Sequence, residues 1–218
     1  MSTIFIDRDG VINENRSDYV KSWDEFHFLS GSREAIAALT KAGHRIVVCT
    51  NQAGVAQGLI SLETMEDIHQ RMLAAIEEAG GVIEKVYACT HSKTADCDCR
   101  KPRPGMLLRA SRELALDMSD AVFIGDSITD MQAGSAAGVQ TMLVLTGLGM
   151  EHYRQHYQQS GRPFHVALNL QHAADIILQG LHLHTIQTSL ERACYELLNF
   201  SEPLEMLRSL QKQYSSIL

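Results

Sequence analysis

The sequence has no apolar run long enough to span a membrane. A spanning helix needs about 18 or more consecutive apolar residues, and the hydrophobic stretches in these 218 residues are all shorter. The first residues also lack the basic and then apolar leader that marks an exported chain. We therefore expect a cytoplasmic protein.

Basic residues are fewer than acidic residues in this sequence. The chain has 19 lysines and arginines against 26 aspartates and glutamates, which gives a net charge of -7 with the histidines neutral. An acidic protein has no general attraction for nucleic acids or anionic membranes, so we expect neither as a partner. Internal repeats are absent as well, and a hydrophobic share of 45% is that of an ordinary globular protein.

Cysteine is scarce, and its count argues against a disulfide framework. The chain has five cysteines, an odd number, and three of them fall within residues 89–99. Crowded cysteines in a reducing compartment are more typical of metal ligation. Cys89, His91, Cys97 and Cys99 could hold zinc tetrahedrally, although reduced thiols in a polar loop are the alternative.

A short apolar run at residues 3–6 ends in two carboxylates and a glycine. β-branched and aromatic residues in this run predict a buried strand. If the strand continued past Ile6, Asp7 and Asp9 would share one face, and like charges so close favour a bound cation or one raised pKa. Taken alone, the stretch is more typical of an acidic turn that ends a strand, with Gly10 allowing a sharp bend.

Strands and helices alternate over most of the chain, which predicts a parallel sheet with helices on both faces, in one domain of residues 1–178. Residues 179–218 carry two apolar helical stripes, and we expect a C-terminal helical appendage. Its stripes are covered either by the body of the chain or by another subunit in a homo-oligomer. The expected strands after the first are residues 45–49, 82–89, 121–124 and 141–145, and the expected helices are residues 32–42, 62–78, 104–116 and a segment ending at 137.

Polar side chains follow several of these strands. Thr50 ends one strand and offers a hydroxyl to an anion, although a simple turn is the alternative. Lys101 follows the cysteine loop and precedes Pro102 and Pro104, which stiffen the backbone that presents it. Asp126 and Asp130 come after a fourth strand. The carboxyl ends of parallel strands meet in one crevice, so we expect these groups to lie together with Asp7 and to bind a ligand there.

This combination resembles the haloacid dehalogenase superfamily of phosphatases. The matching motifs are Asp7-Arg8-Asp9-Gly10, Thr50-Asn51, Lys101, and Gly125-Asp126 with Asp130 in support. The resemblance implies that Asp7 is the nucleophile and Asp9 the general acid and base, with Thr50 and Lys101 stabilising charge.

It also implies that Mg²⁺ is bound by Asp7, the backbone oxygen of Asp9, and Asp126. The acid and base role requires that nearby carboxylates raise the pKa of Asp9. Arg8 receives no role.

Too few residues separate the first motif from the second strand for a large cap domain, so we expect a minimal cap with a zinc loop. This arrangement is similar to the histidinol-phosphate phosphatase subgroup, which raises the expectation of zinc. The resemblance implies a small phosphorylated substrate, either D-glycero-D-manno-heptose 1,7-bisphosphate at its 7-phosphate or histidinol phosphate. Its expected contacts are Arg16, Asn51, Gln52 and Arg100. An inactive zinc-stabilised binding module is the alternative of another class.

Overall fold

The computed structural model describes residues 2–157 and 164–179, which contain a six-stranded parallel sheet in the order β3-β2-β1-β4-β5-β6. Every neighbouring pair runs parallel. The predicted fold class, a parallel sheet of Rossmann type, is therefore confirmed. The strands are β1 (Thr3–Ile6), β2 (Arg45–Asn51), β3 (Lys85–Cys89), β4 (Val122–Gly125), β5 (Gln140–Val144) and β6 (His165–Ala167).

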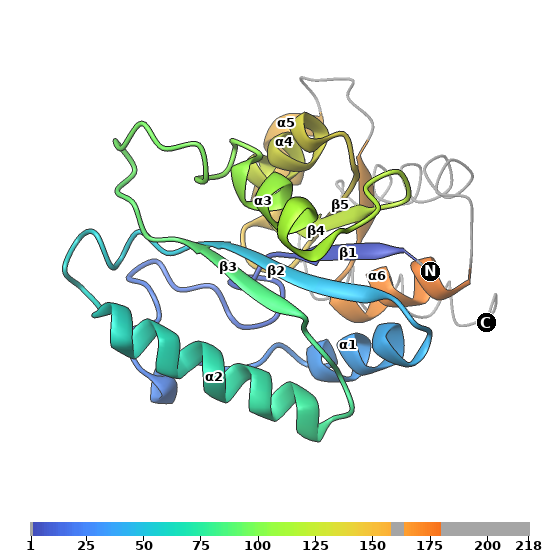
Figure 1. Ribbon diagram of the computed structural model, residues 1–218, viewed down its shortest axis with the longest axis horizontal. Coiled ribbons are helices and arrows are strands. Elements are labelled where there is room, and N and C mark those ends of the chain that lie inside the picture. The colour runs from blue at the N-terminus through green and yellow to red at the C-terminus, as the bar shows by residue number, and fades with distance from the viewer. Residues whose placement is uncertain (1, 158–163, 180–218) are drawn as a thin grey trace.

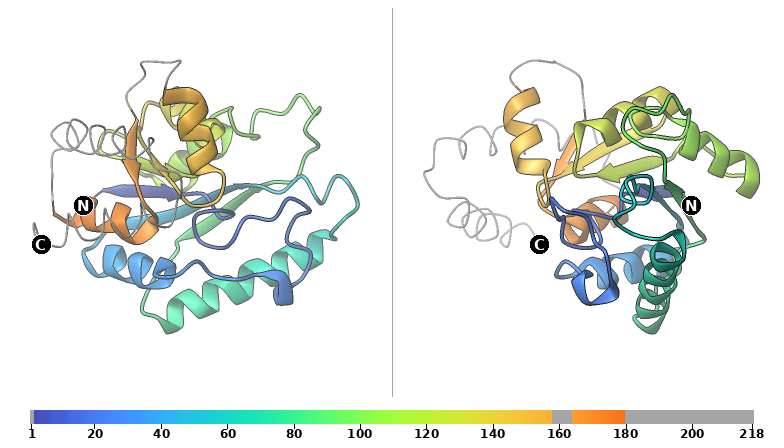
Figure 2. Two further views of the ribbon diagram at one scale, coloured as in Figure 1. Left: turned by 180° about the vertical axis from the view of Figure 1, so that it is seen from behind. Right: turned by 90° about the vertical axis from the view of Figure 1, so that its left-hand side faces the viewer.

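Helices cover both faces of the sheet (Figures 1 and 2). One layer contains α1 (Ser32–Lys41), α2 (Leu62–Glu78) and α6 (Leu170–Leu178), and the other contains α3 (Gly105–Leu114), α4 (Ile128–Ala137) and α5 (Gly149–Tyr157). A short 3-10 helix, η1 (Trp23–Glu25), lies in the connection between β1 and α1. The aromatic rings of Trp23, Phe26 and Phe28 pack together there.

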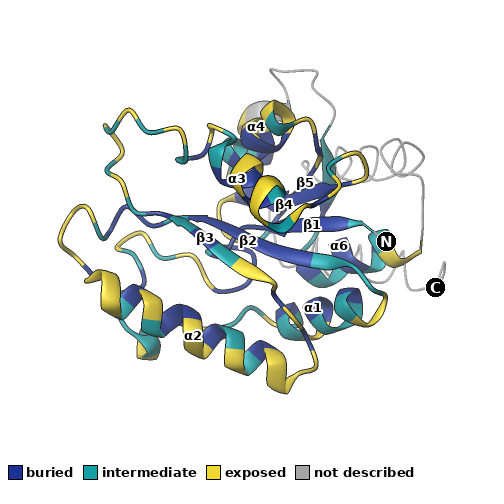
Figure 3. Ribbon diagram, in the orientation of Figure 1, coloured by how far each residue is buried: buried dark blue, intermediate teal, exposed yellow. Residues whose placement is uncertain are grey.

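The side chains of β1 alternate between two separate cores. Ile4 and Ile6 belong to the apolar cluster beneath α1, α2 and α6, whereas Phe5 belongs to the cluster beneath α3 and α4. All of β1 is buried, as Figure 3 shows for the central strands. A strand covered on both faces needs apolar residues at every position, which explains the unbroken apolar run.

The strand order reverses next to β1, because β2 lies on one side of it and β4 on the other. Connections leave such a switch point in opposite directions, so a crevice opens at the carboxyl ends of the two central strands. Asp7 follows β1 and Asp126 follows β4 directly. The topology alone therefore brings these two carboxylates to one place.

Several local predictions differ from the structure. α1 begins at Ser32 after the N-cap Gly31, which has a φ of 78°, and it ends at Lys41, one residue before the expected end. β3 starts at Lys85, later than the expected residue 82. Neither α5 nor β6 was predicted as an element. The expected appendage lies outside the described residues apart from Gln179. No helix in the described ranges has the length and hydropathy of a membrane span.

Close packing of α4 on the sheet gives a test of the fold. A Cβ at Gly134 would lie 2.5 Å from Thr141 Cγ2 and 3.2 Å from Phe123 Cβ. We expect Gly134→Val to lower the free energy of unfolding by about 1–3 kcal/mol through overpacking. Urea denaturation measures this loss. The control Ala136→Val places the same side chain at an exposed position of α4, and equal losses in the two variants would contradict the packing argument.

Candidate active site

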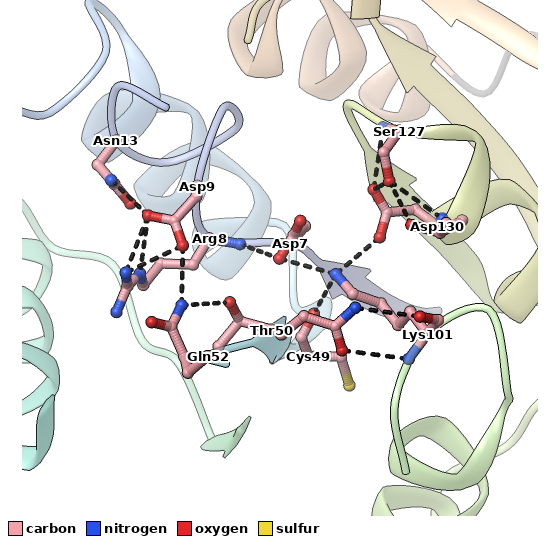
Figure 4. A network of polar contacts seen from close by, with 12 residues as sticks. Asp7, Arg8, Asp9, Asn13, Cys49, Thr50, Gln52, Lys101, Ser127 and Asp130 are labelled. Atoms are coloured by element: carbon pink, nitrogen blue, oxygen red, sulfur yellow. Dashed lines mark hydrogen bonds and ion pairs between the residues drawn. The ribbon is translucent and has the colours of Figure 1, made fainter. Parts of the chain in front are cut away.

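Lys101 lies in the middle of a polar network at the carboxyl ends of the central strands (Figure 4). Its Nζ atom is 2.8 Å from Asp7 Oδ1 and 2.7 Å from Asp130 Oδ1. It also donates a hydrogen bond of 2.9 Å to the Cys49 carbonyl. Only 3% of Lys101 is exposed. One buried cation thus joins the end of β1, the first turn of α4 and the strand β2.

Burial and charge both shift the protonation of this network. Burial raises the pKa of the Asp7 carboxyl to about 7, although the Lys101 ammonium opposes the shift. Burial, then the Asp130 and Asp7 charges, raise the pKa of Asp126 well above its ordinary value. Burial lowers the pKa of Lys101, but the carboxylates outweigh it and raise that pKa overall. Because acids outnumber the single base, another cation would be stabilised here.

The carboxylates of Asp7, Asp126 and Asp130 converge on one point, with oxygen atoms within 4.8 Å of one another. The backbone closes around them at two glycines. A Cβ would lie 1.9 Å from Asp126 Oδ2 if added to Gly10 and 2.1 Å if added to Gly147. Both glycines have positive φ, 81° and 56°. A compact set of buried carboxylate oxygens fits a hard divalent cation such as Mg²⁺.

Asp9 belongs to a separate group of contacts. Arg8 Nη2 donates to both carboxylate oxygens at 2.9 Å, Asn13 Nδ2 donates to Oδ1 at 2.9 Å, and Gln52 Nε2 donates to Oδ2 at 2.8 Å. Asp7 and Asp9 therefore point to different partners, because β1 ends at Ile6 instead of continuing. The two acids were expected to share a face only if the strand continued past Ile6, and it does not.

The expectation of a raised pKa at Asp9 is wrong for this structure. Burial does raise the pKa of Asp9, but the Arg8 charge and the hydrogen bonds from Asn13, Arg8 and Gln52 lower it below its ordinary value. Donors to the charged form of a carboxyl always act in this direction. Asp9 is therefore ionised at neutral pH and ready to accept a proton.

The polar side chains at the end of β2 lie beside these acids. Thr50 is 1% exposed, and its Oγ1 accepts a hydrogen bond of 2.8 Å from Gln52 Nε2, the group that also contacts Asp9. Asn51 makes two bonds of 3.1 Å to Lys101, donating to its carbonyl and accepting from its backbone N–H. Asn51 and Gln52 thus support the site from within, and their contact with substrate stays a prediction.

The two arginines expected to bind substrate lie in different settings. Arg100 is half-buried, and its buried Nη1 atom makes no hydrogen bond among the described residues. Arg16 instead forms ion pairs with Asp18 at 3.0 Å and Glu25 at 3.7 Å in the loop before η1. Arg100 is therefore the better candidate for an anion, since an unpaired buried N–H is costly.

The four residues of the cysteine loop form a second cluster at the end of β3. The Cys99 Sγ atom is 3.3 Å from Cys89 Sγ and 3.2 Å from His91 Nδ1. The Cys89 Sγ atom is 3.8 Å from Cys97 Sγ and 3.6 Å from His91 Nδ1. Zinc bonds of about 2.3 Å to sulfur and 2.0 Å to nitrogen separate tetrahedral ligands by similar distances. The residues therefore fit a closed zinc site.

Three supporting groups were missed by the sequence analysis. Arg8 is buried against Asp9, and His69 of α2 contacts Arg8 Nη1 at 3.0 Å. Ser127 forms a capping box with Asp130 at the start of α4. A signal existed for His69, because it occupies an inward position of an amphipathic helix beside Met65 and Met72. Nothing in the sequence pairs it with Arg8.

Comparison with known proteins adds the family. The HAD-hydrolase-like family matches residues 98–173. A D-glycero-beta-D-manno-heptose-1,7-bisphosphate 7-phosphatase of Neisseria meningitidis serogroup A is 40% identical over 156 residues, covering 72% of this chain and 83% of that protein. The enzyme of the same name from Pseudomonas aeruginosa is 42% identical over 149 residues, covering 68% of this chain and 84% of that protein.

Solved structures agree with the sequence matches. The D,D-heptose 1,7-bisphosphate phosphatase of Bordetella bronchiseptica, complexed with magnesium and phosphate, aligns with a TM-score of 0.78 at 39% identity. This alignment covers 83% of the present chain and 99% of that one. The corresponding enzyme of Burkholderia thailandensis aligns with a TM-score of 0.63 at 36% identity, over 82% and 99% of the two chains. The chain therefore belongs to the haloacid dehalogenase-like hydrolases and, within them, to the phosphatase family of these relatives.

Proposed function

We propose that the protein is a Mg²⁺-dependent phosphatase that removes the 7-phosphate of D-glycero-D-manno-heptose 1,7-bisphosphate through an aspartyl-phosphate. One observation carries the proposal: the Asp7 carboxylate is held by Lys101 beside Asp126 and Asp130 at the switch point of the sheet. The names of the relatives supply the substrate.

Asp7 acts as the nucleophile in the first half of the reaction. One carboxylate oxygen attacks phosphorus, an oxygen–phosphorus bond forms, and the bond between phosphorus and the sugar oxygen breaks. The proton that the leaving alkoxide needs comes from Asp9, which first takes up one proton from the solvent. Lys101 and Thr50 stabilise the negative charge of the transferring phosphoryl group.

Water completes the second half. Asp9, now ionised again, takes a proton from the attacking water, whose oxygen bonds to phosphorus as the bond to Asp7 breaks. The products are inorganic phosphate and the free Asp7 carboxylate. The contacts of Asp9 with Gln52, and of Gln52 with Thr50, orient the base toward the phosphoryl group. Mg²⁺ would be held by Asp7, Asp126 and the backbone oxygen of Asp9, with Asp130 in support, and supplies positive charge that lets two anions meet.

Arg100 is proposed to recognise the second phosphate of the substrate. Its buried Nη1 atom, which makes no hydrogen bond to any described residue, favours an incoming anion, and a guanidinium matches a phosphate through paired hydrogen bonds. Arg100 directly precedes Lys101, so the same loop carries both positively charged side chains. Zinc at the cysteine cluster would hold this loop in place, because Cys99 is only two residues from Lys101.

The nucleophile gives the first test. Asp7→Asn should reduce phosphate release by roughly 10⁴-fold or more, since an amide oxygen cannot replace the carboxylate. Release of inorganic phosphate in the presence of Mg²⁺ measures the effect. The control Asp67→Asn changes an exposed carboxylate on α2, and it should keep full activity. An active Asp7→Asn variant would contradict the mechanism, and an inactive wild-type protein would favour the binding module.

The substrate gives the second test. We expect kcat/KM for the heptose bisphosphate to exceed that for histidinol phosphate by about 10- to 100-fold, the value of charged hydrogen bonds to the second phosphate. Arg100→Met should remove most of this preference. Arg109→Met, which changes an exposed arginine on α3, should preserve it. A preference for histidinol phosphate would overturn the substrate assignment.

Removal of zinc gives the third test. Elemental analysis should find about one zinc per chain. Chelation followed by addition of excess Mg²⁺ should leave the activity low and expose residues 89–101 to proteases, because the loop has few apolar contacts of its own. His91→Ala should lose the zinc, whereas His27→Ala, at an exposed position, should retain it. A metal-free protein with full activity would exclude the zinc site.

A further inference from the structure

Arg8 is a buried cation that the mechanism leaves without a task. It is 1% exposed and is the largest fully buried side chain among the described residues. Its guanidinium contacts both oxygens of Asp9 through Nη2 and one of them through Nε at 3.3 Å. A paired contact of this kind fixes both the distance and the plane of a carboxylate.

The other side of the guanidinium is anchored by His69. Arg8 Nη1 and His69 Nε2 are 3.0 Å apart, and both side chains are buried. A guanidinium only donates, so His69 Nε2 must be the acceptor and the ring proton must lie on Nδ1. Burial, and then the Arg8 charge, lower the pKa of His69 to about 3, which keeps the ring neutral. A neutral acceptor is what this contact requires.

A third contact comes from the loop between β1 and α1. The Arg8 guanidinium carbon lies 5.9 Å from the centre of the Phe26 ring, within reach of a cation–π interaction. Phe26 follows η1 directly, and His69 lies near the middle of α2. The guanidinium is therefore held by two elements outside the catalytic loop while it holds Asp9.

We propose that Arg8 is a positioning residue for Asp9, and that His69 of α2 fixes it in place. This inference rests on the proposed function, because it gives Asp9 the task of moving the proton. If Arg8 rotated, Asp9 would keep Asn13 and Gln52 as its side-chain partners among the described residues and would lose its fixed orientation. The proton would then reach the leaving oxygen less efficiently, since proton transfer requires hydrogen-bond geometry.

The test compares two leaving groups in variants of the full chain. His69→Leu removes the acceptor for Arg8, and His69→Gln restores one through its side-chain carbonyl. A sugar phosphate leaves as an alkoxide that needs a proton, whereas p-nitrophenyl phosphate leaves as a phenolate that does not. His69→Leu should lower kcat/KM for heptose 1,7-bisphosphate by roughly 100-fold, the cost of a group misplaced by about 1 Å. For p-nitrophenyl phosphate the change should stay within about threefold.

Controls separate positioning from stability. Met72→Ala removes a buried side chain from the same helix, so it should lower the melting temperature. It should leave unchanged the ratio of kcat/KM for the heptose bisphosphate to kcat/KM for p-nitrophenyl phosphate. His69→Gln should recover most of the kcat/KM for the heptose bisphosphate that His69→Leu loses. In an Asp9→Asn background, His69→Leu should have no further effect on the heptose substrate, as expected for two residues that act through one group.

Two failures can be told apart. A wild-type protein that hydrolyses neither substrate overturns the proposed function and the role of Arg8 with it. An active wild-type protein whose His69→Leu variant loses both substrates equally, or neither, overturns the positioning role alone. A loss confined to the sugar phosphate and reversed by His69→Gln supports it.

Discussion

A lysine ammonium that is almost completely removed from water needs compensating charge close by, and Lys101 finds it in Asp7 and Asp130. The two carboxylates come from opposite halves of the sheet, one after β1 and one in α4. Breaking such a buried pair leaves an uncompensated charge, which is strongly destabilising. The same ion pairs that orient the nucleophile therefore also hold the two halves of the fold together.

The acidic side chains of the site differ in how their negative charge is compensated. Three acids surround one lysine, so the site carries excess negative charge that burial makes more costly. Asp9 escapes this conflict because Arg8 neutralises it a short distance away. Asp7 and Asp9 thus have opposite pKa shifts, because burial raises the pKa of Asp7, whereas the Arg8 charge and the hydrogen bonds to Asp9 outweigh its burial.

Much of this arrangement could be predicted from the sequence. Runs of β-branched residues located the central strands, and the acids that follow them had to meet once the sheet was parallel. The contacts that could not be predicted join side chains far apart in the chain without a spacing signal, such as Arg8 with His69 and Asn51 with Lys101. The prediction of a raised pKa for Asp9 was wrong for a different reason, because the turn after Ile6 places Arg8 and Asn13, close neighbours in the chain, as donors to its carboxylate. β6 was missed because three residues give too short a pattern to recognise.

The pair of hydrogen bonds between Asn51 and Lys101 bears on whether the irregular loop before Lys101 can gain or lose residues. A side-chain amide that bonds both the N–H and the carbonyl of one residue replaces a peptide group of a neighbouring strand. Lys101 is therefore held in register with β2 as though it belonged to the sheet, although an irregular segment leads to it. Residues of that segment outside the cysteine cluster can then be inserted or lost without displacing the lysine, because its position is set across the sheet rather than along the chain.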